Sequence, residues 1–241
     1  MVLFGRYELF DYLCTNLKQM RILTYNINRS SQEKIDKIMQ FDADVYILPE
    51  VASPAQVKLS EGYRMEWMGN YDFKGLGVIW KSELKAIVPQ WLNPNHQYML
   101  PLMMEGVLIM AAWPTRSDSN APKDYPQIAM EALQEYAPYL KEYSAIISGD
   151  MNCYKGQSGE TKQFSIEAIF DFLGSMGYVS AYHQQTGEVL GKETTATYFH
   201  RFDEKSPFFL DYTFSNIPIK SYTLCNWEKE MSDHVAQVVE I

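Results

Sequence analysis

The chain is poor in cysteine and has no apolar run long enough to cross a membrane. Its most apolar stretch, residues 99–113, includes a proline and an acidic residue and is shorter than the roughly 20 residues that a membrane helix needs. Residues 1–20 carry acidic side chains and lack the apolar core of a secretory signal. The three cysteines are Cys14, Cys153 and Cys225. Because they are odd in number and far apart, they argue against a disulfide framework, and we expect reduced thiols in a cytoplasmic protein without a membrane span.

Clusters of lysine and arginine are also missing. The 241 residues include 21 Lys and Arg against 30 Asp and Glu, which gives a formal net charge of −9. Proteins that bind long nucleic acids neutralise many phosphates and normally carry a basic patch. The composition therefore weighs against tight, nonspecific binding of long nucleic acid, but it leaves open a small phosphate ester or a substrate bridged by a metal. Nothing in the sequence indicates an obligate protein partner.

No repeat, low-complexity tract or clear linker divides the chain, whose length fits one large domain or two small ones. Hydrophobic residues make up 46% and aromatic residues 14%, which is typical of globular proteins. We expect residues 20–241 to form the domain. Residues 1–19 precede "MRILTYNIN", which reads as a start codon followed by a buried strand. We expect them to be an appended helix or the product of an upstream start site.

Helical and strand-like patterns alternate from Met20 onward. Ser30 and Glu33 have the spacing of a capping box at the start of a helix. Predicted helices lie at about 31–40, 127–141 and 162–173, and predicted strands at 21–27, at 44–49, in short pieces within 63–112, in "SAIIS" and through the remainder. Helices between strands occur in both halves, but so do hairpin-like strand pairs. This mixture does not fit a single parallel sheet and favours an α/β fold with two packed mixed β-sheets and helices outside them.

Polar side chains interrupt or end several of the apolar runs. They are Asn26, Asn28, Glu50, Asp150, Asn152, Asp211, Asp233 and His234. Each has an ordinary explanation when taken alone, such as a turn, a helix start or a loop hydrogen bond. Burying an unpaired carboxylate, however, costs several kcal/mol. The set as a whole therefore predicts that these groups satisfy one another or a cation.

The order of five short motifs resembles the endonuclease/exonuclease/phosphatase superfamily, whose members have the deoxyribonuclease-I-like fold. The motifs are "TYNIN", "LPE", "GDMN", "LDYTF" and "SDH", in that order. The family has a strand ending in Asn, a strand ending in Leu-Gln-Glu, then Gly-Asp-x-Asn, Ile/Leu-Asp-Tyr-x-Phe and a final Ser-Asp-His. The resemblance covers about residues 20–241 and implies a four-layer α/β sandwich.

The resemblance also implies a metal site. Glu50 and Asn26 resemble the ligands of a divalent cation, and Asp233 resembles a further metal or water ligand. A small set of oxygen ligands suits Mg²⁺ or Mn²⁺, which keep water and substrate oxygens in their other positions.

Four further residues resemble the catalytic groups of the family. Asp150 resembles the acid that orients or activates the attacking water, and Asn152 resembles the amide that holds the phosphate. His234 resembles the imidazole that contacts the scissile phosphate, and Asp211 the carboxylate that fixes that imidazole. A carboxylate on one ring nitrogen sets the tautomer and stabilises the imidazolium. Such a site would stabilise charge on a phosphorane-like transition state.

The sequence departs from the family pattern at several positions. Pro49 replaces the usual Gln, and Val235 and Ala236 replace the usual residue and proline after the last motif. Trp113 stands where many members carry a His that can protonate the leaving group, which weighs against a pancreatic-type nuclease. Trp113 could stack on a base or sugar, or simply pack at the rim.

Other candidates for substrate contact have weaker signals. Arg29 and Arg116 follow motifs and could clamp a phosphate, although surface arginines are commonplace. His200 and Arg201 lie close in sequence to the "LDYTF" motif. Cys153 follows Asn152 directly, but no base remains to activate it, so we interpret it as a bystander thiol.

These observations predict a divalent-metal-dependent phosphoesterase that cuts a P–O bond. A nuclease is favoured, and a hydrolase of small inositol, nucleotide or lipid phosphates is the alternative. A third possibility is a binding module that has lost catalysis. The sequence leaves open the substrate, endo versus exo cleavage and the preferred metal.

Overall fold

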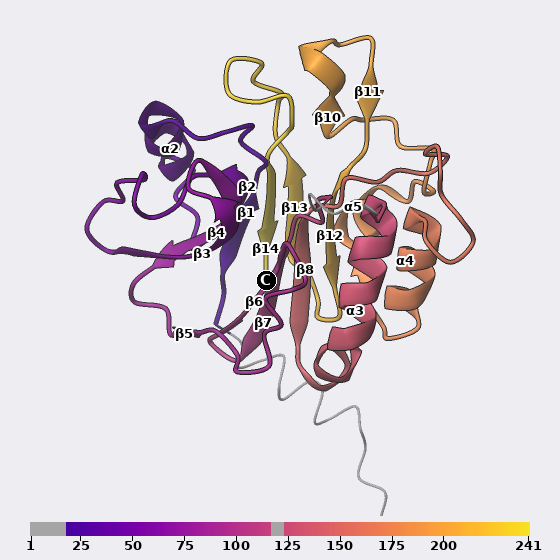
Figure 1. The fold of residues 1–241 in the computed structure, drawn as a ribbon, viewed down its shortest axis with the longest axis horizontal. Coiled ribbons are helices and arrows are strands. Elements are labelled where there is room, and N and C mark those ends of the chain that lie inside the picture. The colour runs from indigo at the N-terminus through magenta and orange to yellow at the C-terminus, as the bar shows by residue number, and fades with distance from the viewer. Residues whose placement is uncertain (1–17, 117–122) are drawn as a thin grey trace, which may run out of the picture.

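The computed structural model describes residues 18–116 and 123–241 (Figure 1). The helical extension predicted for residues 1–19 lies outside these residues, apart from its last two positions. No helix in the described ranges has both the length and the apolar composition needed to cross a membrane.

The described chain forms two mixed six-stranded sheets. The first has the order β13-β14-β1-β2-β4-β3, in which only β1 and β2 are parallel. Its strands are β1 (Arg21–Thr24), β2 (Val45–Val51), β3 (Tyr63–Tyr71), β4 (Lys74–Lys81), β13 (Ser221–Leu224) and β14 (Gln237–Glu240).

The second sheet has the order β5-β6-β7-β8-β12-β9, with β7 and β8 parallel and the other pairs antiparallel. Its strands are β5 (Ala86–Ile87), β6 (Met99–Met104), β7 (Val107–Ala112), β8 (Ala145–Asp150), β9 (Val179–Ser180) and β12 (Asp211–Ser215). A separate small hairpin consists of β10 (Tyr198–Phe199) and β11 (Pro207–Phe208), with the 3₁₀ turn η1 (His200–Phe202) between them.

Helices cover the outer faces of the two sheets (Figure 1). Helix α2 (Gln32–Met39) lies on the first sheet, and α3 (Tyr125–Glu142), α4 (Ile166–Gly174) and α5 (Ala181–Thr186) lie beside the second. The arrangement confirms the predicted α/β sandwich of two packed mixed sheets flanked by helices.

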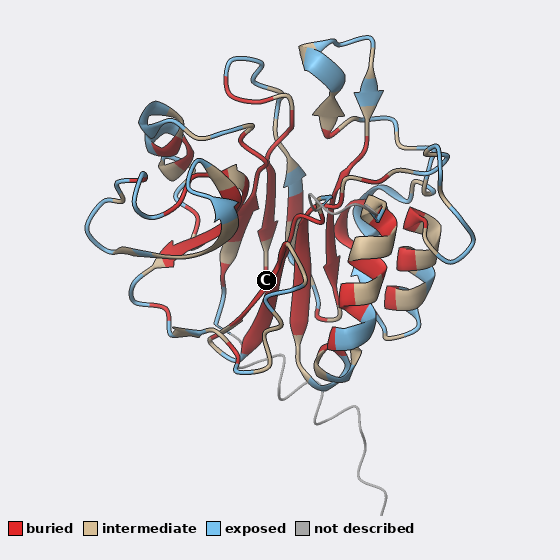
Figure 2. Ribbon diagram, in the orientation of Figure 1, coloured by how far each residue is buried: buried red, intermediate tan, exposed pale blue. Residues whose placement is uncertain are grey.

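The main core unites apolar side chains of both sheets, such as Ile47 and Ile146, with side chains of α3 and α4. Most positions along the central strands are buried (Figure 2). Successive side chains of a strand point to opposite faces. In β1, Ile22 belongs to the main core and Leu23 to the smaller core under α2. Burial of both faces explains why these strands read as continuous apolar runs.

Two local predictions need correction. The N-cap of α2 is Ser31, whose side chain accepts a hydrogen bond from the Lys34 amide at 3.2 Å. Ser30 instead accepts one from the Ala52 amide at 2.9 Å and ties the helix entry to the end of β2. The predicted boundaries of α3 and α4 shift by one to four residues, and β6 and α5 were not predicted.

Gly149 sets the spacing of the strands next to the candidate site. It pairs with Ala112 across the parallel β7–β8 ladder, and a Cβ atom at position 149 would lie 1.7 Å from the Ala112 carbonyl oxygen. Only glycine allows this approach without a backbone shift. The residue that follows it, Asp150, is thereby fixed at the end of β8.

Candidate active site

Strand pairing brings the predicted motifs to one end of the sandwich. Because β8 and β12 are antiparallel, the end of β8 meets the start of β12, and Asp150 pairs directly with Asp211. In the same way, the antiparallel β1–β14 pair brings the segment before β14, with His234, beside the end of β1, where Asn26 lies. Glu50 lies near the end of β2, the parallel neighbour of β1.

Asp150, Asp211 and His234 form what we call the buried triad. His234 Nδ1 lies 2.9 Å from Asp211 Oδ2, and His234 Nε2 lies 3.8 Å from Asp150 Oδ2. Each of the three residues is at most 4% exposed. The imidazole is therefore held between two carboxylates in a site almost closed to water.

The two carboxylates govern the charge of the imidazole. Burial lowers the pKa of His234, but the nearby Asp211 and Asp150 carboxylates outweigh it and raise the pKa to about 9. Burial raises the pKa of Asp150 to about 7; the His234 charge opposes this shift and the Asp211 charge adds to it. At neutral pH the imidazole thus keeps its proton, and both ring nitrogens are hydrogen-bond donors.

The donor atoms of the buried triad lie within 4.8 Å of one another, so the group has the dimensions of a metal site. A protonated imidazole, however, has no lone pair for a metal. His234 Nδ1 is already hydrogen-bonded to Asp211 at 2.9 Å, and the oxygen atoms of Glu50 and Asn26 nearby are the ligands that a hard divalent cation prefers.

Asn26 connects the buried triad to Glu50. Its Nδ2 donates to Asp150 Oδ2 at 2.9 Å and, more weakly, to Glu50 Oε1 at 3.5 Å. Its Oδ1 accepts from the Asn28 amide at 3.0 Å, which leaves the second lone pair of that oxygen for another partner. Ser232 fixes the backbone at Asn26 and His234. Its hydroxyl donates to the Asn26 carbonyl at 2.6 Å and accepts from the His234 amide at 3.1 Å.

Glu50 and Lys74 form a second unit, which we call the rim pair. Lys74 Nζ lies 3.1 Å from Glu50 Oε2 and 4.9 Å from the centre of the Trp113 ring. Glu50 has a φ of 66° and lies at an irregularity between Pro49 and Val51 in the β2–β4 pairing. Such a bulge re-aims a side chain. The contact shows that the Glu50 carboxylate accommodates a cation.

The motifs gave no indication of Lys74 or of a second lysine, Lys34. Lys34 Nζ donates to the carbonyl oxygens of Ile27, Asn28 and Arg29 at 2.7, 3.2 and 3.2 Å. Asn28 and Arg29 both have positive φ, so this ammonium group holds an irregular loop directly after Asn26. Burial lowers the pKa of Lys34, and the charges of Asp233 and Glu50 oppose that shift.

Asn152 lies at the edge of the site, in a turn that directly follows β8. The strand ends at Asp150, and Asn152 has a φ of 51°. Its amide donates to Asp150 Oδ1 at 2.8 Å, and its Nδ2 donates to the Pro114 carbonyl at 3.0 Å. A turn capped by Asp150 thus places Asn152, and one N–H of its carboxamide is already used.

The remaining candidates lie in different surroundings. Asp233 Oδ1 lies 3.5 Å from Ser232 Oγ, whose one proton is already donated to the Asn26 carbonyl. Trp113 is only 3% exposed and stacks on Tyr98, so it offers little surface for a base or sugar. Cys153 is fully buried, and burial raises the pKa of its thiol, as fits a bystander.

The other predicted substrate contacts, apart from Trp113, are exposed. Arg29 and Arg201 lie at the surface, and Arg116 pairs with Asp124 at 2.5 Å. His200 Nδ1 lies 2.9 Å from the Tyr198 hydroxyl.

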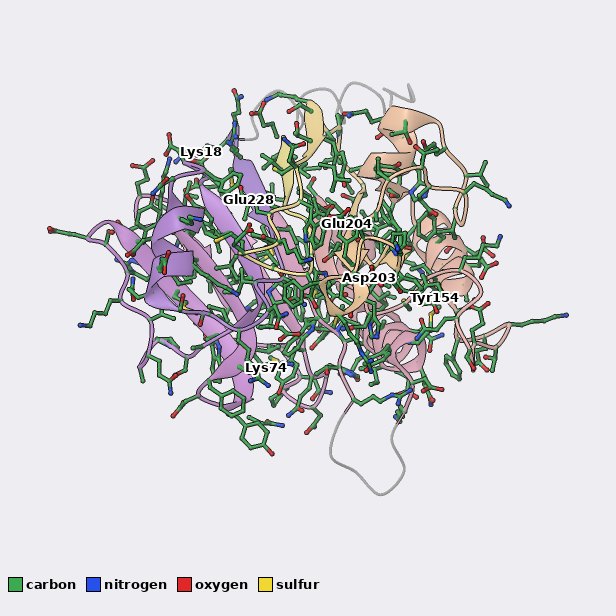
Figure 3. The ribbon with its side chains drawn as sticks, turned by 90° about the horizontal axis from the view of Figure 1, so that it is seen from above. Lys18, Lys74, Tyr154, Asp203, Glu204 and Glu228 are labelled. Atoms are coloured by element: carbon green, nitrogen blue, oxygen red, sulfur yellow. The ribbon has the colours of Figure 1, made fainter. Side chains whose placement is uncertain are left out.

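The small β10–β11 hairpin reaches the buried triad through Tyr198, whose ring centre lies 4.6 Å from that of His234. The hairpin stands above the sheets, and its turn carries Asp203 and Glu204 toward the viewer in Figure 3, with Lys74 on one side and Tyr154 on the other. The turn of the hairpin therefore carries acidic side chains.

Comparison with solved structures shows which fold this is. A 3′ phosphatase, NExo, from Neisseria, bound to a product DNA hairpin, superposes with a TM-score of 0.64 at 15% identity and covers 91% of this chain and 98% of its own. An AP endonuclease from Archaeoglobus fulgidus gives 0.63 at 16% identity with the same coverage. An endonuclease/exonuclease/phosphatase from Beutenbergia cavernae gives 0.59 at 12% identity over 92% of this chain and 71% of its own.

The chain therefore has the fold of endonuclease/exonuclease/phosphatase-type structures, as the motif order predicted. No family model and no curated protein matches the sequence.

Proposed function

We propose that this protein is a divalent-metal-dependent phosphoesterase that hydrolyses a P–O bond, with a phosphodiester of a nucleic acid as the favoured substrate. The observation that carries the proposal is one continuous set of contacts from Glu50 through Asn26 and Asp150 to His234 and Asp211. These side chains come from distant parts of the sequence. Their convergence in a place where burial is costly supports a functional role.

Glu50 and Asn26 would hold the metal, with Asp233 as a further ligand. Their oxygen donors suit Mg²⁺ or Mn²⁺, and the contact of Glu50 with the Lys74 ammonium supports a cation at this place. When bound, the ion would supply Lewis-acid stabilisation of charge on the phosphoryl oxygens.

The buried triad would handle protons. Asp150, with a pKa near 7, would orient the attacking water and accept its proton. His234 would donate a hydrogen bond to a phosphoryl oxygen, and Asp211 would keep the ring oriented and charged. The second N–H of the Asn152 carboxamide would contact the same phosphate.

Two observations bear on the substrate class. The AP endonuclease and the 3′ phosphatase with its DNA hairpin favour a DNA-type substrate over an inositol or lipid phosphate. The net charge of −9 favours a short or single-stranded substrate over a long duplex. Pro49 replaces the usual Gln, and Trp113 replaces a His that many members carry, but the other polar residues of the family pattern are present. This set favours an enzyme over an inactive binding module.

A substrate panel tests the proposal. The purified chain with Mg²⁺ or Mn²⁺ would be offered single- and double-stranded DNA, RNA, an abasic duplex and inositol phosphates. We expect hydrolysis of at least one nucleic acid, abolished by EDTA and restored by the metal. Hydrolysis of inositol phosphates alone would favour the alternative substrate class. No hydrolysis of any substrate with any divalent ion would contradict the enzyme assignment.

A further inference from the structure

A row of hydrogen-bonded polar side chains crosses from one sheet to the other, one step along the strands from the buried triad. All of its members are at most 4% exposed, although the main core around them is apolar. We call this row the polar layer, and it consists of Thr24, Ser148, Thr213, Tyr222 and Gln237. Burying polar groups is costly unless each finds a partner, so the contacts within the layer are what makes its position tolerable.

Four hydrogen bonds connect the polar layer. Thr24 Oγ1 lies 2.7 Å from Ser148 Oγ, which lies 2.6 Å from Thr213 Oγ1. Thr213 Oγ1 and the Tyr222 hydroxyl both donate to Gln237 Oε1, at 3.3 and 3.1 Å. Because Gln237 Oε1 can only accept, Thr213 gives its proton to that oxygen and accepts a proton from Ser148. The row therefore has one direction, from Thr24 through Ser148 and Thr213 to Gln237.

Strand pairing places the members of the polar layer opposite one another. In the first sheet, Thr24 of β1 pairs with Gln237 of β14. In the second sheet, Ser148 of β8 pairs with Thr213 of β12. The contacts between Thr24 and Ser148 and between Thr213 and Gln237 are therefore hydrogen bonds that join one sheet to the other.

The buried triad also joins the two sheets. Asp150 and Asp211 pair with each other in the second sheet, two residues along the strands from Ser148 and Thr213, whereas His234 precedes β14 of the first sheet. The 2.9 Å contact between His234 and Asp211 thus depends on how the sheets lie against each other. Apolar packing is non-directional, but hydrogen bonds have preferred lengths and angles. The polar layer supplies such directional contacts next to the triad.

We propose that Thr213 is a positioning residue, which fixes the placement of the two sheets through the polar layer and so keeps Asp211 in contact with His234. Thr213 contacts Ser148 in its own sheet and Gln237 in the other, and it follows Asp211 by two residues on the same face of β12. This inference rests on the proposed function and deepens it, because it assigns part of the catalytic geometry to a hydroxyl group outside the site.

Thr213→Val tests the inference, because it removes the hydroxyl and keeps the shape of the side chain. Ser148 keeps its contact with Thr24, and Gln237 keeps its contact with Tyr222, so we expect the variant to fold. We expect kcat on the preferred substrate to fall about 10- to 100-fold, because small displacements of reacting groups have effects of this size.

The metal dependence should not change in Thr213→Val. The proposed ligands Glu50 and Asn26 lie in or directly after strands of the first sheet, so their spacing does not depend on the polar layer. The metal concentration for half-maximal activity should therefore match that of the wild type. A general loss of structure would change this concentration together with kcat, and that result would overturn the inference.

Two variants of the same strand serve as controls. Thr213→Ser keeps the hydroxyl and should keep most of the wild-type kcat. Ser215→Ala removes another buried hydroxyl of β12, which donates to the Ile217 carbonyl at 2.7 Å and accepts from its amide at 3.1 Å. It should lower stability to urea without lowering kcat. An equal fall of kcat in Ser215→Ala and Thr213→Val would overturn the inference, as would a wild-type kcat in Thr213→Val.

An NMR experiment separates this inference from the proposed function. The proton on His234 Nδ1, which faces Asp211 Oδ2, is observed in ¹⁵N-labelled protein at one fixed pH in EDTA and is identified by its absence in His234→Ala. We expect its signal to shift or broaden in Thr213→Val and to stay unchanged in Thr213→Ser and Ser215→Ala.

The two possible failures give different results in these experiments. A shifted signal in Thr213→Val, in a protein that hydrolyses no substrate, would support the positioning role and contradict the proposed function alone. An unchanged signal in Thr213→Val would overturn the inference even if the phosphoesterase assignment holds.

Discussion

The buried triad and the rim pair lie within one site and differ in what fixes them. The triad residues are at most 4% exposed and are held in place by hydrogen bonds to one another and to Asn26. The side chains of Glu50 and Lys74 are 19% and 33% exposed. Ion pairs with access to water contribute about 0–1 kcal/mol, so another cation can replace Lys74 at low cost.

The comparison indicates a division of labour. In the proposed function, the buried triad would transfer protons and hold a phosphoryl oxygen. In the proposed function, a metal ion would take the place of the Lys74 ammonium beside Glu50. Asn26 contacts Asp150 of the buried triad and Glu50 of the rim pair, so it connects the two groups. Four substitutions probe this division, from the largest expected effect to the smallest.

We expect His234→Ala to have the largest effect on activity, a loss of about 10³-fold in kcat/KM, because it removes the group proposed to contact the phosphate. Excess metal should not restore activity. Steady-state kinetics on the preferred substrate measures this. His96→Ala is the control, since that imidazole pairs with Glu135 at the surface. Near-wild-type activity of His234→Ala would show that the buried triad is not needed for catalysis.

Glu50→Gln should raise the metal concentration needed for half-maximal activity by about 10- to 100-fold. Excess Mn²⁺ should restore much of the rate, in contrast to His234→Ala. Metal titration of activity, and of bound Mn²⁺ by EPR, gives two readouts. Glu105→Gln is the matched control, because Glu105 has a similar side-chain exposure of 21% and also contacts a lysine, at 3.9 Å. An unchanged titration would place the metal elsewhere.

Asp150→Asn should change how stability depends on pH in the metal-free protein. Folding raises the pKa of Asp150 from 3.8 to about 7. The protonated carboxyl group therefore favours the folded state, and this stabilisation is complete below pH 4 and is lost as the pH rises through 7. The variant should therefore gain stability relative to wild type over this range. Loss of the carboxylate should also lower the pKa of His234 from about 9.

Urea unfolding at several pH values in EDTA, together with NMR titration of the imidazole, measures both effects. A constant stability difference between pH 4 and 8 would show that Asp150 does not titrate as its burial implies.

Lys34→Met should have the smallest effect, a loss of about 1 kcal/mol in the free energy of unfolding and a several-fold fall in kcat. The carbonyl oxygens of the loop after Asn26 lose their ammonium donor, but water can replace part of it. Lys37→Met is a control on the same helix. An effect on stability equal to that of the control would mean that Lys34 does not hold the loop.

Much of the fold follows from local patterns in the sequence. The apolar runs around Ile47 and Ile147 predict buried strands, and both residues lie in the main core. The apolar pattern did not predict β6, because residues 99–113 form one apolar stretch with no clear break in the sequence. Glu105 and Gly106 have positive φ and turn that stretch into a hairpin. The choice between Ser30 and Ser31 as N-cap also depended on a distant group, the Ala52 amide.

For the site, the sequence predicted which acids, amides and imidazole interrupt the strands. The structure brings Asn26, Glu50, Asp150, Asp211 and His234 together, and the roles assigned to them stay predictions. Lys34 and Lys74 could not be predicted, since a lysine on a helix or in a hairpin carries no local signal of its contacts. The burial of Trp113 could not be predicted either, because its contacts with Lys74 and Tyr98 depend on segments far away in the chain.

By itself, the sequence determined the residue types of the site and their order, because apolar strands that end in polar groups can be recognised from short stretches of chain. Only the tertiary structure decided the charge states and the partners. The pKa of His234 depends on two carboxylates from other strands, and the cation next to Glu50 comes from a neighbouring hairpin. Burial and electrostatic interactions act through space, so no single segment of the sequence contains them.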